Sequence, residues 1–406
     1  MSTRTNAVIF AGFFTLFIAF AIRYSYGMLL PYMLEEFQIS KTEAGCIYSA
    51  YFAALTIAVV FIGVLADRFN LRIIVTLATL FVGAGAVLMS FSTSVVNASL
   101  FFMVTGLGAS ACWVPFTVLI NRWVGAKRRG TALTLTEAGS AIGIIAASSL
   151  MPLIIGLFDW RTGWLILGLF AFLATALNLA LVKNPRHNTN PPETRLLAGN
   201  RETVTNAYLN TFKNARFWLL GVSYLLVGFL ILVPFTFLTT YAFQELKLSF
   251  QAATGLITII GIAGITGKLV LGTLSDRLGR IQMMIVASTL LAFGCLGMVF
   301  FYHYMILSVF TVIFGLGYGA VWPIYAASVS DYFPGNRTGL VFSLWNLFAG
   351  VGSIISPVIS GWVIDVSGNF SLAFALAAVA AIISVVLLLI VGKLAHHEAV
   401  TNVDEG

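Results

Sequence analysis

Charged residues are scarce in this chain. Of its 406 residues only 9 % are Asp, Glu, Lys or Arg, whereas 59 % are hydrophobic and the mean hydropathy is +0.97. A soluble domain carries about 25 % charged residues, so this chain has too few to cover a water-soluble globule. The composition excludes a soluble enzyme, a disordered chain and a nucleic-acid-binding protein, and we attribute the net charge of +7 to membrane topology.

Cysteine and buried reactive groups are also rare. The three cysteines, Cys46, Cys112 and Cys295, lie in apolar stretches, and we interpret them as small core residues without a disulfide or metal framework. The sequence has no glycine-rich phosphate-binding loop, so ATP is not expected to drive this protein. No Ser/His, Asp/Asp or His/Glu set stands deep inside an apolar stretch, which argues against an intramembrane enzyme; neither a cofactor nor a metal is expected.

Long hydrophobic runs, by contrast, make up most of the chain. About 20 mostly apolar residues cross the hydrocarbon layer as a helix, and the backbone inside lipid must satisfy its own hydrogen bonds. The first run follows a short polar start and is too long for a cleavable signal peptide. Twelve predicted spans result: 8–32, 44–66, 73–91, 97–120, 131–157, 162–182, 216–243, 251–274, 281–301, 303–329, 338–364 and 370–393.

The distribution of positive charge predicts the orientation. With both termini in the cytoplasm, 17 of the 22 Lys and Arg residues fall in cytoplasmic segments and only Lys41, Arg161 and Lys247 in outer loops. This asymmetry indicates a multi-pass protein of the cell (inner) membrane. The expected domains are an N-terminal six-helix half at 1–182, a cytoplasmic linker at 183–215, a C-terminal half at 216–393 and a cytoplasmic tail at 394–406.

The two halves repeat each other at a single offset of 209 residues. Such a gapless repeat predicts two pseudo-symmetric halves of the same orientation, with a substrate site near the midplane between them. The matching pairs are Gly63/Gly272, Leu65/Leu274, Asp67/Asp276, Arg68/Arg277, Gly106/Gly315, Leu107/Leu316, Gly108/Gly317, Trp113/Trp322, Arg128/Arg337, Gly130/Gly339 and Gly143/Gly352.

The segment from Gly63 to Arg68 resembles the loop signature of the major facilitator superfamily, and the segment from Gly272 to Arg280 is its fuller copy. Asn70 departs from the pattern, which has glycine there, as Gly279 does in the second copy. The resemblance covers almost the whole chain. It implies an all-α integral membrane fold of 12 transmembrane helices and a transporter that alternates access by rocking its halves.

The repeated loops are predicted to support gating. Their glycines are expected to allow close approach of a neighbouring helix, and their aspartates to form charge-assisted bonds when the cytoplasmic side is closed. A merely solvated turn is the alternative. The candidate gating residues are Asp67, Arg68, Arg128, Glu137, Asp276, Arg277 and Arg337.

Arg23 is the sharpest candidate for a binding residue. It lies about 4–5 Å beyond the midpoint of the first span, where a charge costs roughly 2.5–3.5 kcal/mol on insertion scales. Tyr26 follows on the same helix face. The planar fork of arginine suits a carboxylate, so we expect Arg23 to bind an anionic substrate. A structural ion pair and snorkelling to the interface are the alternatives.

Lys268 and Glu137 lie at matching depths in the eighth and fifth spans. In the superfamily fold these helices are neighbours, so the resemblance implies an inner gate pair. Lys268 also stands where monocarboxylate and oxalate/formate transporters carry an anion-binding arginine, which makes it a possible second carboxylate ligand. A plain structural role is the third interpretation.

Aromatic and polar residues at helical spacing are candidates for the cavity lining. The resemblance places the first, fourth, seventh and tenth helices around the cavity, although such stripes also serve packing. Tyr48 and Tyr51 are weaker candidates. The predicted lining residues are Trp113, Thr117, Tyr318, Trp322, Tyr325 and Asn346.

These features predict a secondary active transporter that moves a small organic anion, a monocarboxylate, together with protons. The proton carrier is either Glu137 or the substrate itself near Arg23. An organic anion exchanger or an exporter of amphipathic compounds is the alternative. The expected partners are the anionic substrate, protons and the lipid bilayer, without nucleic acid, and the chain is expected to act as a monomer.

Overall fold

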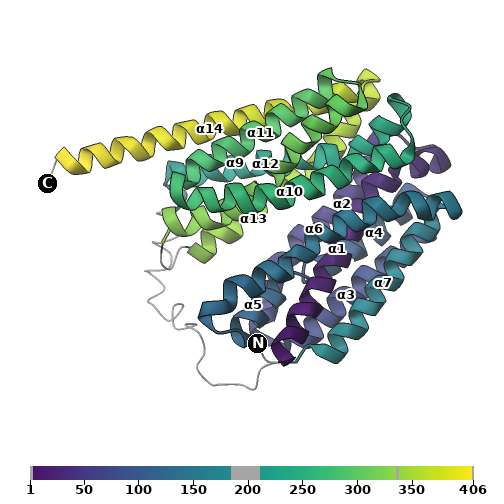
Figure 1. Cartoon of the computed structure of the whole chain (residues 1–406), viewed down its shortest axis with the longest axis horizontal. Coiled ribbons are helices and arrows are strands. Elements are labelled where there is room, and N and C mark those ends of the chain that lie inside the picture. Colours follow the sequence, from purple (N-terminus) through teal and green to yellow (C-terminus); the bar gives the residue numbers. More distant parts are fainter. Residues whose placement is uncertain (1–2, 184–210, 335–337, 405–406) are drawn as a thin grey trace. The chain divides into compact units, whose positions relative to one another are not determined.

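The computed structural model describes residues 3–183, 211–334 and 338–404 (Figure 1). Across these ranges the secondary structure is helical and no strand occurs. Twelve helical segments of this part are long and apolar enough to cross a membrane. The predicted fold class, an all-α integral membrane protein with twelve spans, is therefore confirmed.

The helices within 3–181 follow one another with short connections, as do those within 215–334. From the N-terminus they are α1 (Thr3–Phe37), α2 (Lys41–Arg68), α3 (Leu71–Ser90), α4 (Val95–Ala109), α5 (Val114–Trp123), α6 (Ala126–Leu157) and α7 (Trp160–Leu181). The later helices are α9 (Ala215–Thr240) with its π-helical end η2 (Tyr241–Glu245), α10 (Phe250–Leu278), α11 (Arg280–Phe300), α12 (Tyr304–Tyr332), α13 (Thr338–Ser367) and α14 (Phe370–Asp404).

The contacts divide the chain into two compact units. Unit 1 takes the described residues within Met1–Arg186, together with Leu232–Ile262 and Ile354–Ala373. Unit 2 takes the described residues within His187–Ile231, Ala263–Ser353 and Phe374–Gly406. This grouping follows packing rather than chain order, and the predicted linker at 183–215 lies mostly outside the described residues.

The internal repeat recurs in the packing of each unit. A Cβ atom built on Gly108 of α4 would lie 2.4 Å from the carbonyl oxygen of Ala78 in α3. A Cβ built on Gly317 of α12 would lie 2.7 Å from the carbonyl oxygen of Ala287 in α11. Both distances are too short for any side chain, so both helix pairs require glycine for their close approach. All four positions obey the offset of 209, and the same helix–helix contact is therefore built twice.

The signature loops differ from expectation in two ways. Within its own unit, no described residue outside the helix itself lies within 4 Å of a Cβ built on Gly63 or Gly272, so neither glycine serves a close approach there. Gly279 has φ +98°, a conformation that favours glycine. Asn70 has φ −65° and instead accepts a hydrogen bond from the amide of Arg72, capping α3. Asn70 thus starts α3 with a side-chain cap, whereas the signature pattern has a glycine at this position.

The predicted fourth span is interrupted. Helix α4 ends at Ala109 and α5 begins at Val114, with a tight turn in which the Cys112 amide donates to the Ala109 carbonyl. Pro115 stands in the first turn of α5, where its missing N–H and fixed φ favour a helix start. Trp113 consequently lies at the break, which sequence periodicity did not indicate.

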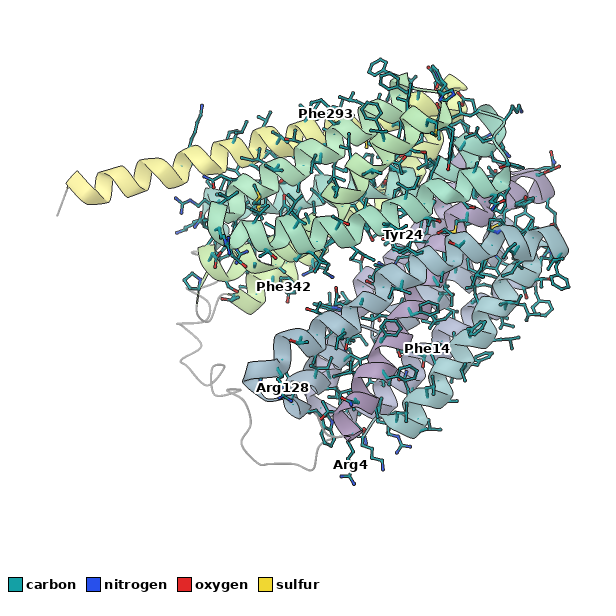
Figure 2. The ribbon with its side chains drawn as sticks, viewed as in Figure 1. Arg4, Phe14, Tyr24, Arg128, Phe293 and Phe342 are labelled. Carbon is teal, nitrogen blue, oxygen red and sulfur yellow. The ribbon has the colours of Figure 1, made fainter. Side chains whose placement is uncertain are left out.

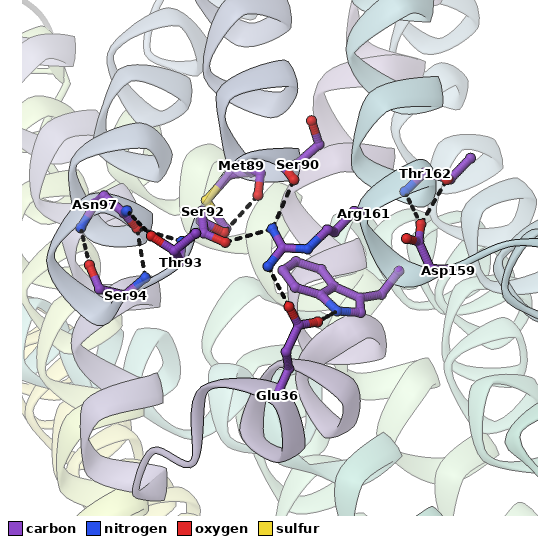
Figure 3. Close-up of polar contacts among 11 residues, drawn as sticks. Glu36, Met89, Ser90, Ser92, Thr93, Ser94, Asn97, Asp159, Arg161 and Thr162 are labelled. Carbon is purple, nitrogen blue, oxygen red and sulfur yellow. Dashed lines mark hydrogen bonds and ion pairs between the residues drawn. The ribbon is translucent and has the colours of Figure 1, made fainter.

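A polar cluster lies where α1 ends and α7 begins (Figure 3). Arg161, at the start of α7, forms an ion pair with Glu36 near the end of α1. The same guanidinium donates to the carbonyl oxygens of Ser90 and Ser92 at 2.9 and 2.6 Å, and Trp160 Nε1 donates to Glu36 at 2.5 Å. Glu36 and Arg161 therefore tie α1 and α7 to the α3–α4 connection.

The first turn of α2 is completed by a distant carboxylate. Asp365 of α13 accepts from the Lys41 amide at 3.0 Å, the Thr42 amide at 2.8 Å and the Thr42 hydroxyl at 2.6 Å. Ser40 caps the next amide, that of Glu43, at 3.1 Å. Three amide donors that a helix start leaves unpaired thus have partners, two of them from another helix.

Candidate functional site

Arg23 lies well along α1 from the end of the helix that carries Arg4. Figure 2 shows Arg4 and Arg128 at one end of unit 1, and Tyr24, the neighbour of Arg23 in the chain, away from that end. The Arg23 side chain is half-buried, and its Nε donates to the hydroxyl of Tyr51 in α2 at 3.0 Å. Its side chain therefore turns towards α2 rather than along α1.

Aromatic rings supply the other contacts of the guanidinium. Its central carbon lies 4.8 Å from the ring centroid of Phe20, 5.4 Å from that of Phe52 and 5.5 Å from that of Tyr51. Each such contact contributes about 0.5–2 kcal/mol. The rings offset part of the cost of placing a charge at this depth, but they leave the charge unneutralised.

No acidic residue in the described ranges forms an ion pair with Arg23. Two arginines at helix ends do have such partners: Arg161 pairs with Glu36, and Arg280 pairs with Asp276 and Asp331. Among the alternatives for Arg23, the structural ion pair is therefore not formed here. A positive charge without a fixed counter-ion is the main electrostatic feature of this site.

Two tyrosine hydroxyls brace α1 against α2 beside Arg23. Tyr48 donates to the main-chain oxygen of Arg23 at 3.0 Å, and Tyr26 donates to the main-chain oxygen of Ala44 at 2.6 Å. Both rings pack on Phe102 of α4, with centroids 5.8 and 5.2 Å apart. Tyr26 is fully buried and its hydroxyl is used in this brace, so its predicted contact with substrate stays a prediction without geometric support.

The functional residue that sequence reasoning ranked too low is Tyr51, whereas Tyr48 serves the packing of α1 against α2. Tyr51 is the hydrogen-bond partner of the key charge, and Tyr48 holds its backbone. The available signal was two tyrosines three residues apart in an apolar span, which places both on one helix face. That this face meets Arg23 depends on the packing of α1 and α2, which the sequence does not give.

Glu137 of α6 accepts a hydrogen bond from the indole nitrogen of Trp113. The break between α4 and α5 puts this ring beside α6, and 40 % of Trp113 is exposed. A predicted gating residue and a predicted lining residue are therefore brought together within unit 1. The hydroxyl of Thr117 turns back to the Trp113 carbonyl at 3.3 Å.

Lys268 is half-buried in α10 and belongs to unit 2, whereas Glu137 belongs to unit 1. The two interpretations of Lys268, as gate partner and as substrate ligand, both stay predictions.

The predicted aromatic face of α12 packs against α9. The Tyr325 ring stacks on Tyr224 with centroids 4.4 Å apart, and its hydroxyl lies 2.6 Å from that of Ser223. The Trp322 ring meets Tyr224 edge-on at 5.5 Å. Tyr325 is fully buried, so its hydroxyl serves the helix packing here, while Trp322 is partly exposed. Tyr318 is also buried.

The remaining predicted lining residue, Asn346 of α13, is half-buried. Its amide donates to the Phe342 carbonyl of its own helix at 2.8 Å.

Arg280 is the centre of the second signature loop, although it was not among the predicted gating residues. It pairs with Asp276 at 2.6 Å and with Asp331 at 3.0 Å, and it donates to the Ser275 hydroxyl at 2.5 Å. It therefore joins the ends of α10, α11 and α12 within unit 2. The predicted gating arginines Arg68, Arg128 and Arg277 are exposed. The side chain of Asp67 is not described, and Arg337 lies outside the described residues.

In the part of the chain that the structure describes, twelve apolar helices, a helix contact built twice and a deep arginine without an ion-pair partner are typical of a membrane transporter. The chain belongs to the Major Facilitator Superfamily, whose family model matches residues 12–306 and 256–405.

Individual relatives support the same class. The chain is 27 % identical over 403 residues to "Monocarboxylate transporter 4" of Mus musculus, which covers 95 % of this chain and 82 % of that protein. It is 23 % identical over 415 residues to "Hexuronate transporter" of Bacillus subtilis (strain 168), covering 95 % and 96 %. A crystal structure of a mutant of the nucleoside transporter NupG has a TM-score of 0.78 at 16 % identity, covering 94 % and 98 %, and shows the shared fold. These relatives are transporters and not enzymes.

Proposed function

We propose that this protein is a secondary active transporter of a small organic anion, a monocarboxylate, which moves by alternating access together with protons. The observation that carries the proposal is Arg23, a permanent cation deep in α1 with no ion-pair partner among the described residues. A bound carboxylate would supply the missing negative charge through two parallel hydrogen bonds. A neutral sugar would not require such a charge.

The names of the relatives agree with this chemistry. Monocarboxylates and hexuronates both carry a carboxylate, and both words stand in the names of proteins that match nearly the whole chain. At identities of 27 and 23 %, these names support a carboxylate as the substrate class and do not point to one particular compound.

The orientation and gating follow the charge pattern. We place both termini in the cytoplasm, because Lys and Arg concentrate in the connections on that side. The Glu36–Arg161 cluster then lies on the outer side. The Asp276–Arg280–Asp331 cluster would lie at the cytoplasmic end of unit 2, beside the signature loop that we propose supports gating.

A thermal-shift screen tests the substrate class. Purified protein is heated with carboxylates, amino acids, sugars and cationic drugs, because a compound that binds only the folded state stabilises it by mass action. We expect specific stabilisation by small monocarboxylates. Stabilisation by neutral or cationic compounds alone would overturn the proposal.

A charge swap separates the two interpretations of Lys268. The double variant Lys268→Glu, Glu137→Lys is compared with each single variant for carboxylate uptake into proteoliposomes. If the two residues form a gate pair, the singles lose uptake and the double regains most of it. Continued loss in the double variant supports Lys268 as a substrate ligand, and normal uptake by Lys268→Glu alone contradicts both.

A further inference from the structure

The Arg23 guanidinium is held at one edge only. Its Nε donates to the Tyr51 hydroxyl at 3.0 Å, whereas its two terminal nitrogens form no hydrogen bond with any described residue. Neither terminal nitrogen is among the buried nitrogens that lack a hydrogen-bond partner, and the Arg23 residue is only half-buried. With Phe20 and Phe52 beside the guanidinium, the terminal edge is the part left for a ligand.

Tyr51 is itself held firmly in place. A Cβ built on Gly106 would lie 2.2 Å from the Tyr51 main-chain oxygen, so the backbone of α4 lies directly against α2 at this residue. The Tyr51 ring packs on Phe102 with centroids 4.8 Å apart, and Tyr51 is fully buried. Its hydroxyl is therefore an acceptor whose position is set by three packed helices.

We propose that Tyr51 is a positioning residue that fixes the Arg23 guanidinium, so that its terminal edge selects a single planar carboxylate on a small apolar body. This inference rests on the proposed function, because it takes Arg23 as the anion-binding group. A carboxylate matches two parallel N–H donors. A second charged group on the ligand would meet the aromatic rings around Arg23 without a partner and would be disfavoured.

The test compares Tyr51→Phe with the matched control Tyr48→Phe. Both variants remove one buried hydroxyl from the same face of α2, but the Tyr48 hydroxyl bonds the Arg23 backbone and not the guanidinium. Binding of propionate, ethanesulfonate and propionamide to the full chain in nanodiscs is measured by calorimetry. These probes share an ethyl group and differ in carrying a planar anion, a tetrahedral anion or no charge.

We expect the wild type to prefer propionate over both other probes. Tyr51→Phe should weaken propionate binding about tenfold, equivalent to about 1.4 kcal/mol, and bring ethanesulfonate close to propionate. Tyr48→Phe should leave both affinities within about twofold, even where it lowers the unfolding temperature. Equal effects of the two variants on binding would overturn the proposal.

A second measurement does not depend on a ligand. Solvent exchange of the Arg23 Nε–H is followed by nitrogen-15 NMR, with its resonance assigned by its loss in Arg23→Lys. The positioning role is supported if the exchange is slow in the wild type and becomes at least about tenfold faster in Tyr51→Phe but not in Tyr48→Phe. This result would support the positioning role even if propionate fails to bind. In that case only the proposed function would be overturned. Exchange that is equal in all three proteins overturns the positioning role.

Discussion

At the scale of single residues, Arg161 and Arg280 have carboxylate partners, whereas Arg23 has none among the described residues. Arg161 and Arg280 each meet carboxylates and additional oxygen acceptors, and both stand at helix ends. Arg23 stands deep in α1 with a phenol and aromatic rings. Matched charges at helix ends join elements, whereas an unmatched deep charge is costly to keep without a function.

Asp159 provides a prediction at this scale that concerns stability rather than transport. Its carboxylate caps α7 and accepts from the Thr162 hydroxyl and amide, both at 2.7 Å, and these bonds lower the pKa of Asp159. The stabilisation is present above the usual carboxyl pKa of about 3.9 and is lost as pH falls through the lower pKa of the folded state. Asp159→Ala should therefore cost about 1 kcal/mol at neutral pH, and less in acid.

Unfolding of the purified variants in detergent, followed across pH, measures this effect. Asp159→Asn serves as control, because it keeps an oxygen acceptor and should lose less. A loss in Asp159→Ala that is the same at acid and neutral pH would contradict the account.

The sequence indicated Arg23 because depth alone makes a charge conspicuous, but it did not indicate the partner. Tyr51 could be identified only once α1 and α2 were seen to pack, and Tyr325 resembled a lining residue until its hydroxyl was found on Ser223. Side-chain partners across helices depend on tertiary packing, which helical periodicity does not encode.

At the scale of elements, hydropathy was sufficient to predict the membrane spans, but it did not predict where a span is interrupted. All twelve predicted stretches coincide with apolar helices of the described chain. The turn between Ala109 and Val114 was not predicted, because Pro115 is compatible both with a kinked helix and with a helix start. The glycine pattern indicated a repeat, and Gly108 and Gly317 each meet the backbone of a neighbouring helix, whereas a Cβ built on Gly63 or Gly272 would meet no described residue of its own unit within 4 Å.

Asp365 offers a prediction about how elements are joined. Its carboxylate accepts the first two amides of α2, those of Lys41 and Thr42. In Asp365→Ala we expect these amides to exchange with deuterium about tenfold faster, equivalent to about 1.4 kcal/mol of local protection.

Hydrogen-exchange mass spectrometry of the peptides covering the start of α2 checks this expectation, with Asp365→Asn as the variant that keeps an acceptor. The start of α7, capped by its own Asp159, should be unaffected in both. Unchanged exchange at Lys41 and Thr42 would show that water replaces Asp365 without cost.

At the scale of the whole molecule, a helix–helix contact is repeated at the offset of 209 residues, whereas the deep arginine is not. The contact between Gly108 and Ala78 recurs between Gly317 and Ala287, but the position 209 residues after Arg23 is Leu232. The packing contact is thus repeated at the offset of 209, whereas the arginine that we propose binds the substrate is not.

Uptake of a labelled monocarboxylate into proteoliposomes by Arg23→Ala tests the central claim most directly. Arg122→Ala, which removes an exposed arginine at the end of α5, is the matched control. With equal amounts of folded protein inserted, we predict that Arg23→Ala loses at least about 100-fold in uptake, since a paired charge is worth about 3 kcal/mol or more when its partner is removed. Arg122→Ala should transport normally. Uptake by Arg23→Ala at the wild-type rate would contradict the claim that Arg23 binds the transported anion.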